Sequence, residues 1–213
     1  MASAREALQE AALAALPVAV VYFSGWAYLS SYLNDFGLDA TQVSVALTTV
    51  LVYAFKPLSS WPVLGTCAAF LVVAASAFFL PQRYRDRLAA FNYLFGFVTI
   101  VVLLFLIRWV GQNQANELAE SVWHGDHLQT QVVPVTPVRG DVAYTNYELC
   151  RSGSRLQQIL GLPEQTFLLC RSELSPCERG TIYAFGASGA ISATANIAHE
   201  NRGGENGCKP TVH

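Results

Sequence analysis

The sequence predicts an integral membrane bundle of α-helices followed by a small α+β domain. Residues 62–80 and 88–107 contain no charged side chain, and each run is close to the about 20 residues with which a helix crosses a bilayer. The chain is 53% hydrophobic and only 13% charged, averaged over a very apolar first half and an ordinary second half. We therefore expect the chain to divide near Gly111 into a transmembrane domain (17–110) and a soluble one.

The first expected span covers residues 17–33, which are uncharged and long enough to cross a bilayer at the lower limit. Residues 1–16 are rich in alanine and are expected to extend the same helix towards the N-terminus. A cleavable signal peptide fits less well, because Glu6 and Glu10 follow Arg5 and several aromatic rings occupy the apolar stretch.

Residues 43–56 form a short apolar segment with two interpretations. Its apolar run is too short to span by itself, so its length favours a half-span, either re-entrant or lying at the interface. A tilted fourth span is the alternative. The remaining expected spans are 62–80 and 88–109, which gives three spans with the short helix, or four.

Three arginines predict the orientation of these spans. Arg83, Arg85 and Arg87 lie in the loop between the last two spans, and basic loops favour the cytoplasmic side. With three spans, Arg5 lies on that side as well, and the C-terminal domain faces outward. The prediction is a multi-pass protein of the cell inner (cytoplasmic) membrane with a periplasmic or extracellular C-terminal domain.

The cysteines agree with an outward domain. Cys67 falls in a span, whereas Cys150, Cys170, Cys177 and Cys208 all fall in the soluble part, and an even number suits disulfides in an oxidising compartment. We expect Cys170 to pair with Cys177 across a hairpin loop, and Cys150 with Cys208. Four reduced thiols in a cytosolic domain are the alternative.

The soluble domain (111–198) is expected to begin with a helical stalk over residues 112–123 that continues the last span. Residues 129–138 are β-prone but contain prolines, which indicates an edge strand or a linker. A short helix is expected at 154–160, ending at Gly161, and strands at 166–171, 180–186 and 190–197, the last two forming a hairpin. The tail (199–213) is expected to be mobile unless Cys208 anchors it.

One cluster has the residue types of a metal site. His124, Asp126 and His127 lie just beyond the stalk and could share a zinc or copper ion, with His199, Glu200 or His213 as a fourth ligand. The favoured interpretation is a solvated turn, because the two histidines lack the spacing of a zinc-protease helix. No motif of a hydrolase or of a phosphate-binding loop occurs, so neither catalytic residues nor cofactors are predicted.

Within the spans, small and polar side chains are expected to serve helix packing or oligomer contacts. Ser24 and Ser31 share one helix face, and Trp26 and Asn92 need hydrogen-bond partners in hydrocarbon. These four residues are the packing candidates. Apart from Arg108 at a span end, no ionisable acid or base is expected at bilayer depth, which speaks against ion-coupled transport.

Residues 24–42, followed by a short β-branched run, resemble small bacterial inner-membrane proteins, and the resemblance implies an interfacial segment after the first span. The favoured function is a non-enzymatic membrane anchor for an extracytoplasmic sensing or interaction domain. A transport or channel subunit lined by Ser24, Ser31, Thr48 and Thr49 is the alternative, and a membrane-bound metalloenzyme is a distant third. The expected partners are the lipid bilayer and a protein or second copy, and the weak charge of −2 disfavours nucleic acid.

Overall fold

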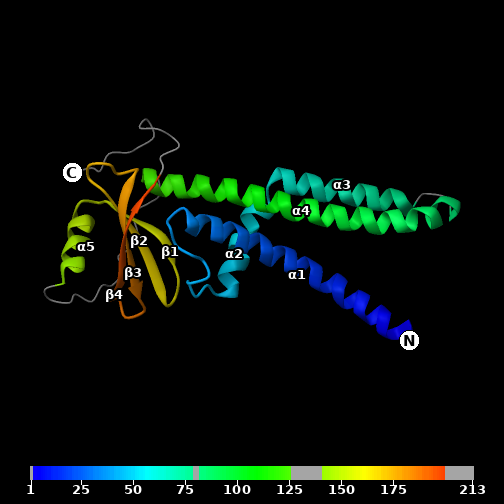
Figure 1. Cartoon of the computed structure of the whole chain (residues 1–213), viewed down its shortest axis with the longest axis horizontal. Helices are drawn as coiled ribbons and strands as arrows, with labels where there is room; N and C mark the ends of the chain where they lie inside the picture. The colour runs from blue at the N-terminus through cyan, green and yellow to red at the C-terminus, as the bar shows by residue number, and fades with distance from the viewer. Residues whose placement is uncertain (1, 79–81, 126–140, 200–213) are drawn as a thin grey trace. The chain divides into compact units, whose positions relative to one another are not determined.

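The computed structural model describes residues 2–78, 82–125 and 141–199, which form five helices and a four-stranded antiparallel sheet (Figure 1). The chain divides into two compact units. The first contains Met1–Leu33 and Asp39–Ala115, and the second contains Asn34–Leu38 and Asn116–His213. The division falls inside a helix, between Ala115 and Asn116.

Four helices build the first unit. α1 (Ala2–Asn34) contains the expected first span and passes through Pro17 without ending. α2 (Leu47–Leu58) has 12 residues, which is the length of a half-span, and its Pro57 lies in the last turn. α3 (Trp61–Phe78) and α4 (Gln82–His124) follow, and α4 includes both the last expected span and the predicted stalk in one helix of 43 residues.

Two of these helices are long and apolar enough to cross a membrane, judged over the described residues. The apolar stretches are Ala14–Asn34 of α1 and Gly96–His124 of α4. Leu47–Leu58 and Trp61–Val72 form shorter apolar helices. The expected span 62–80 coincides with α3 but reaches beyond Phe78 into residues that the structure does not describe.

Three helices of the first unit meet in one apolar cluster. Val63 of α3 packs with Ile107 and Val110 of α4, and Val20 and Phe23 of α1 pack against them. The start of α3 thus lies beside the later part of α4, as in an antiparallel helical hairpin, whereas α1 contributes its middle.

α1 and α2 cross in backbone contact. A Cβ atom on Gly25 would overlap the carbonyl group of Val50, so only glycine permits this approach. The Ser24 hydroxyl donates a hydrogen bond to the Ala54 carbonyl oxygen at 3.4 Å. Small side chains on α1 therefore allow α2 to lie directly against it.

The second unit contains a meander of four antiparallel strands in the order β1-β2-β3-β4. The strands are β1 (Leu156–Gly161), β2 (Gln165–Arg171), β3 (Arg179–Gly186) and β4 (Ile191–Ala198). The three predicted strands are confirmed as β2, β3 and β4, and the predicted hairpin turns at Gly189, whose φ of 77° belongs to the left-handed region. An α+β layout is therefore observed.

The predicted helix at 154–160 is wrong. Leu156–Gly161 pairs with β2 as the edge strand β1, and Ser154 has a φ of 54°, which a helix cannot accommodate. Leu160 and Ile159 are buried, so pairing with β2 and burial outweigh the helical propensity of the glutamines.

α5 (Val142–Ser152) is not among the predicted elements, and its first turn is capped by the Asp141 carboxylate, which accepts from the Ala143 N–H. An aspartate followed by apolar side chains three residues apart, Tyr144, Tyr147 and Cys150, is a helix signal that could have been read. Residues 129–138, expected as an edge strand or a linker, lie outside the described residues.

α5 covers one face of the sheet (Figure 1), where Tyr147 packs on Leu168, Tyr183 and Phe185. Tyr147 meets both rings edge-on, with centroid distances of 5.8 Å to Tyr183 and 5.2 Å to Phe185. On the opposite face, Trp123 at the end of α4 lies over Gly180, where a Cβ atom would come within 3.3 Å of the indole ring. The sheet is therefore the centre of two small cores.

Candidate functional site

A disulfide fastens α5 to the sheet. Cys150 of α5 bonds to Cys170 of β2, and the Cα atoms lie 6.0 Å apart. The predicted pairings of Cys170 with Cys177 and of Cys150 with Cys208 are therefore wrong. The reason is that α5, which was not predicted, brings Cys150 over β2. Cys177 is also disulfide-bonded, whereas Cys67 is a free, exposed thiol, and Cys208 lies outside the described residues.

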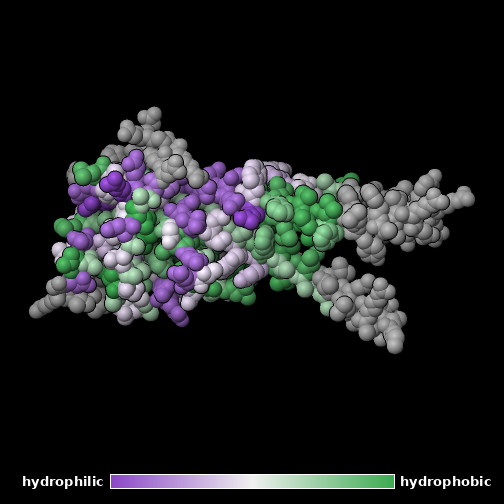
Figure 2. Space-filling model, viewed as in Figure 1, coloured by the Kyte–Doolittle hydropathy of each residue, from purple (hydrophilic) through white to green (hydrophobic). Residues whose placement is uncertain are grey.

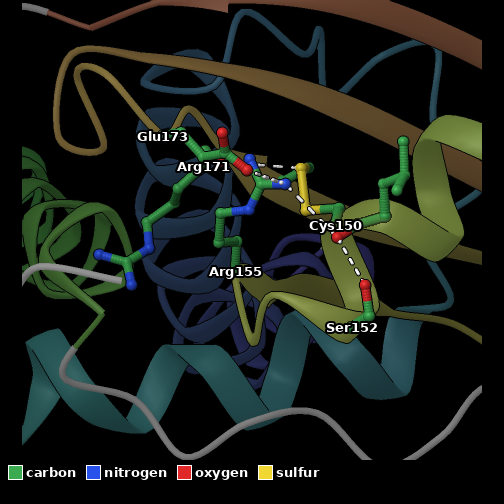
Figure 3. A network of polar contacts seen from close by, with 7 residues as sticks. Cys150, Ser152, Arg155, Arg171 and Glu173 are labelled. Carbon is green, nitrogen blue, oxygen red and sulfur yellow. Dashed lines mark hydrogen bonds and ion pairs between the residues drawn. A yellow bond between two sulfur atoms is a disulfide. The ribbon is translucent and has the colours of Figure 1, made fainter. Parts of the chain in front are cut away.

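Arg155 bridges two segments beside this disulfide (Figure 3). Its guanidinium forms an ion pair with Glu173 at 2.9 Å and donates to the Leu149 carbonyl oxygen near the end of α5 at 3.4 Å. The Arg155 side chain is only 13% exposed, whereas Glu173 is 60% exposed. The pair therefore joins α5 to the loop after β2 and leaves a carboxylate at the surface.

Arg171 caps the end of α4 within the same unit. Its guanidinium donates to the carbonyl oxygens of Trp123 and His124 at 3.4 and 3.2 Å, and the side chain is buried. A cation at a helix C-terminus is favoured by the helix dipole, and it satisfies carbonyl groups that have no partner within the helix.

An aromatic stack continues from this cap. The Trp123 indole lies parallel to the Phe36 ring at 6.0 Å and to the His199 ring at 4.9 Å. Phe36 belongs to the segment Asn34–Leu38, which explains why these few residues group with the second unit. His199 is thereby used in stacking at the end of β4.

An open groove of about 840 Å³ lies between α5 and the sheet. Asn146 and Leu149 of α5 form one wall, and Thr181 and Asn196 on the strands contribute to its lining. The Thr181 hydroxyl donates to the Asn196 side-chain oxygen at 2.9 Å, across β3 and β4. Hydroxyl and amide groups therefore line the sheet side of the groove.

Charged side chains also line the groove. Arg155, Glu173 and Arg179 contribute to its lining, and Arg179 is exposed. Burial raises the pKa of the nearby Tyr183 hydroxyl, and the positive charge of Arg155 opposes this shift. The phenol is therefore a neutral donor at ordinary pH, and the groove offers donors and acceptors to an uncharged or anionic polar ligand.

The predicted packing residues lie in different settings. Ser24 is fully buried at the α1–α2 crossing, and Ser31 is partly buried in α1. Trp26 stacks on Tyr22 with a centroid distance of 6.4 Å. Asn92 lies in α4, in a part where the structure describes no side chains.

The predicted metal candidates are only partly described. His124 is the last residue of α4, and its carbonyl oxygen accepts from Arg171, whereas Asp126 and His127 lie outside the described residues. In the described part of the chain, no three histidine, cysteine, aspartate or glutamate side chains gather as a metal site. The groove residues carried no sequence signal, because they come from α5, two loops and three strands.

The chain matches no protein-family model, and neither the curated proteins nor the solved structures contain a significant match to it.

Proposed function

We propose that this protein is a non-enzymatic, multi-pass protein of the cytoplasmic membrane that holds a small disulfide-bonded domain on the outer side, where the domain senses or binds a partner. The observation that carries this proposal is the exposure of large apolar side chains along the helices of the first unit.

These side chains are too exposed for a water-soluble helical bundle. Val18 is 66% exposed on α1, Leu71 66% on α3 and Phe105 69% on α4. Figure 2 shows hydrophobic residues gathered over the helical part of the molecule. Contiguous exposed apolar surface of this kind marks a membrane or protein contact, and helices that satisfy their own backbone groups are suited to lipid.

The disulfides support the outward placement of the second unit. Cys150 and Cys170 form a disulfide in which Cys150 is buried, and Cys177 is disulfide-bonded as well. Disulfides persist in oxidising compartments. The arginines at 83, 85 and 87, which lie at the start of α4 instead of in the predicted loop, favour the cytoplasmic side for that end of the helix. Two independent arguments therefore favour the same orientation.

The groove beside α5 supports a binding role for the outer domain. It is open, and it presents hydroxyl, amide and guanidinium groups rather than an enclosed apolar cavity. A surface of this type recognises polar groups by hydrogen bonds, and Arg179 and Glu173 add charge to it. We assign the groove to partner recognition.

Cysteine labelling in sealed spheroplasts that carry the full chain tests the orientation. The Cys67→Ala variant removes the free thiol, and an impermeant PEG-maleimide is added with or without an impermeant phosphine reductant. Labelling that requires the reductant but not permeabilisation is the expected result. Labelling only after permeabilisation would place the domain in the cytosol and overturn the proposal.

Alkaline carbonate extraction of the same membranes tests integration. The chain is expected to stay with the lipid pellet and to be released only by detergent. Recovery in the carbonate supernatant would mean that the apolar helices are covered by protein, and the anchoring function would be wrong.

A further inference from the structure

The exposed apolar surface of α1 ends well before the helix does. Val18 and Tyr22 are 66% and 43% exposed, whereas Tyr28 and Leu29 are fully buried. The later part of the predicted span 17–33 is therefore apolar because protein surrounds it. Its composition gives no reason to place it in lipid.

α3 and α4 have a matching limit. The exposed apolar side chains of α3 begin at Trp61, which is 86% exposed, and those described on α4 end at Trp109, which is 58% exposed. Immediately beyond Trp109 the exposed residues of α4 are Gln112 and Asn113. α4 thus changes from exposed apolar to exposed polar residues close to a tryptophan, and α3 begins at one.

Contacts within the first unit show that these limits lie at one level. Phe23 of α1 packs on the cluster of Val63, Ile107 and Val110, which joins the three helices. Five residues further along α1, the backbone of Tyr28 lies 3.7 Å from the Cβ position of Gly111. α1 and α4 therefore run in the same direction side by side. The ends of the exposed apolar surface on the three helices coincide near Phe23, Trp61 and Trp109.

α2 crosses α1 at this same level. Val50 and Ala54, one turn apart on α2, both contact the Ser24–Gly25 pair, so the contact does not advance along α1 as it would between parallel helices. Figure 1 shows α2 running across α1 rather than along it. Val52 and Phe55 point away from this contact and are 69% and 74% exposed.

From these levels we infer that the outer limit of the bilayer hydrocarbon passes through Phe23, Trp61 and Trp109, and that α2 lies in the plane of the lipid interface with Val52 and Phe55 against the acyl boundary. The last third of α1 then stands outside the hydrocarbon, and the embedded part of the predicted span 17–33 is limited to the residues up to Phe23. This inference rests on the proposed membrane function. The phospholipid surface is the ligand of the exposed face of α2.

Helix length agrees with this placement. At 1.5 Å per residue, about 20 residues cross about 30 Å of hydrocarbon. Counted from Trp61 along α3 and from Trp109 back along α4, this distance ends just short of the arginines at 83–87. Counted from Phe23 back along α1, the uncharged stretch ends after about 13 residues at Glu10, with Glu6 beyond it, so α3 and α4 provide the full crossing distance and α1 does not. Tryptophans then mark the outer interface and arginines the inner one, as membrane proteins prefer.

Nitroxide depth measurements on the full chain in phosphatidylcholine and phosphatidylglycerol vesicles test the inference. Single cysteines replace Leu71, Val18, Thr48 and Phe55, all exposed, in a Cys67→Ser background, and the background chain without a new cysteine checks that the label goes nowhere else. The readout is the ratio of relaxation by oxygen, which concentrates in lipid, to relaxation by a polar nickel chelate.

The ratio is expected to be several-fold higher at Leu71 than at Phe55, intermediate at Val18, and similar at Thr48 and Phe55. A ratio at Phe55 as high as that at Leu71 would place the α1–α2 crossing at mid-bilayer and overturn the inference. A steep change from Thr48 to Phe55 would make α2 re-entrant, which also overturns it.

Two further outcomes are separable. Low access of both reagents at Thr48 and Phe55 would show a protein partner or second copy on α2 in place of lipid, and the inference would be wrong. Nickel access without oxygen enrichment at both Leu71 and Val18 would show that the first unit is not in the bilayer, and the proposed function itself would fail. Size-exclusion elution equal to that of the background chain shows that each variant remains folded.

Discussion

Gly25 illustrates how a single residue decides helix packing in this protein. Its missing side chain lets the α2 backbone approach α1, and the neighbouring Ser24 supplies a hydrogen bond to the Ala54 carbonyl oxygen. Ser24 is among the packing residues predicted from the sequence, whereas Gly25 is not. The reason is that a glycine in an apolar run has many roles, and only the position of α2 distinguishes them.

Gly25→Ala is expected to destabilise the helical unit by about 1–3 kcal/mol, because the new methyl group must push α2 away or distort α1. The midpoint of unfolding by SDS in mixed micelles measures the change. Gly65→Ala in α3 is the matched control, since a Cβ atom there meets nothing within 4 Å. Equal midpoints for both variants would show that the close crossing is absent in the membrane.

At the scale of the elements, α5 and β1 show how tertiary context decides between helix and strand. Residues 154–160 combine glutamines and leucines that would suit a helix, yet Leu156–Gly161 completes the sheet beside β2. The pairing brings Cys170 next to the end of α5, where Cys150 is available. The pairing of Cys150 with Cys170 was therefore missed because α5, which carries Cys150, was not predicted.

The double variant Cys150→Ala/Cys170→Ala is expected to lose about 3 kcal/mol of stability in the second unit, because the bond closes a loop of 20 residues. Protease resistance of the full chain across a urea series, read with an antibody or tag at the C-terminus, measures the loss. Cys67→Ala is the control and should leave the midpoint unchanged. An unchanged midpoint in the double variant would mean that packing of Tyr147 alone fixes α5.

The tyrosine core under α5 predicts a loss of stability in alkali. Burial raises the pKa of Tyr147 and Tyr183 above the usual value of about 10. Because the folded state keeps these protons and the unfolded state releases them, the contribution of the two tyrosines to stability is constant below about pH 9. It falls as the pH rises past about 10.

The same urea series at pH 8 to 11 checks this expectation. The double variant Tyr147→Phe/Tyr183→Phe removes the two ionisable groups, so its midpoint should fall less over that range than that of the original chain. A parallel decline in both proteins would assign the alkaline loss to other groups.

At the scale of the whole molecule, the chain combines an apolar helical unit with a disulfide-bonded α+β unit, and α4 belongs to both. The orientation proposed for this arrangement depends on charge at one end of the helical unit. Arginines at 83, 85 and 87 account for most of that charge.

Replacing these three arginines by glutamine is expected to produce a mixture of orientations, because basic loops are what hold a span end on the cytoplasmic side. Protease protection of the second unit in spheroplasts measures the outward fraction, which should fall from nearly all to about half. Arg151→Gln, far along the chain in α5, is the control. A fully outward triple variant would mean that another part of the chain sets the topology.

The sequence alone determined the helical first half, the short length of α2 and three of the four strands, because long apolar runs, charge boundaries and alternating patterns are local signals. The tertiary structure decided the strand β1, the pairing of Cys150 with Cys170, the groove residues and the burial of the later part of α1. These features depend on neighbours distant in sequence. An apolar side chain that faces lipid and one that faces a protein core read alike in a sequence, and only the packing of Tyr28 and Leu29 tells them apart.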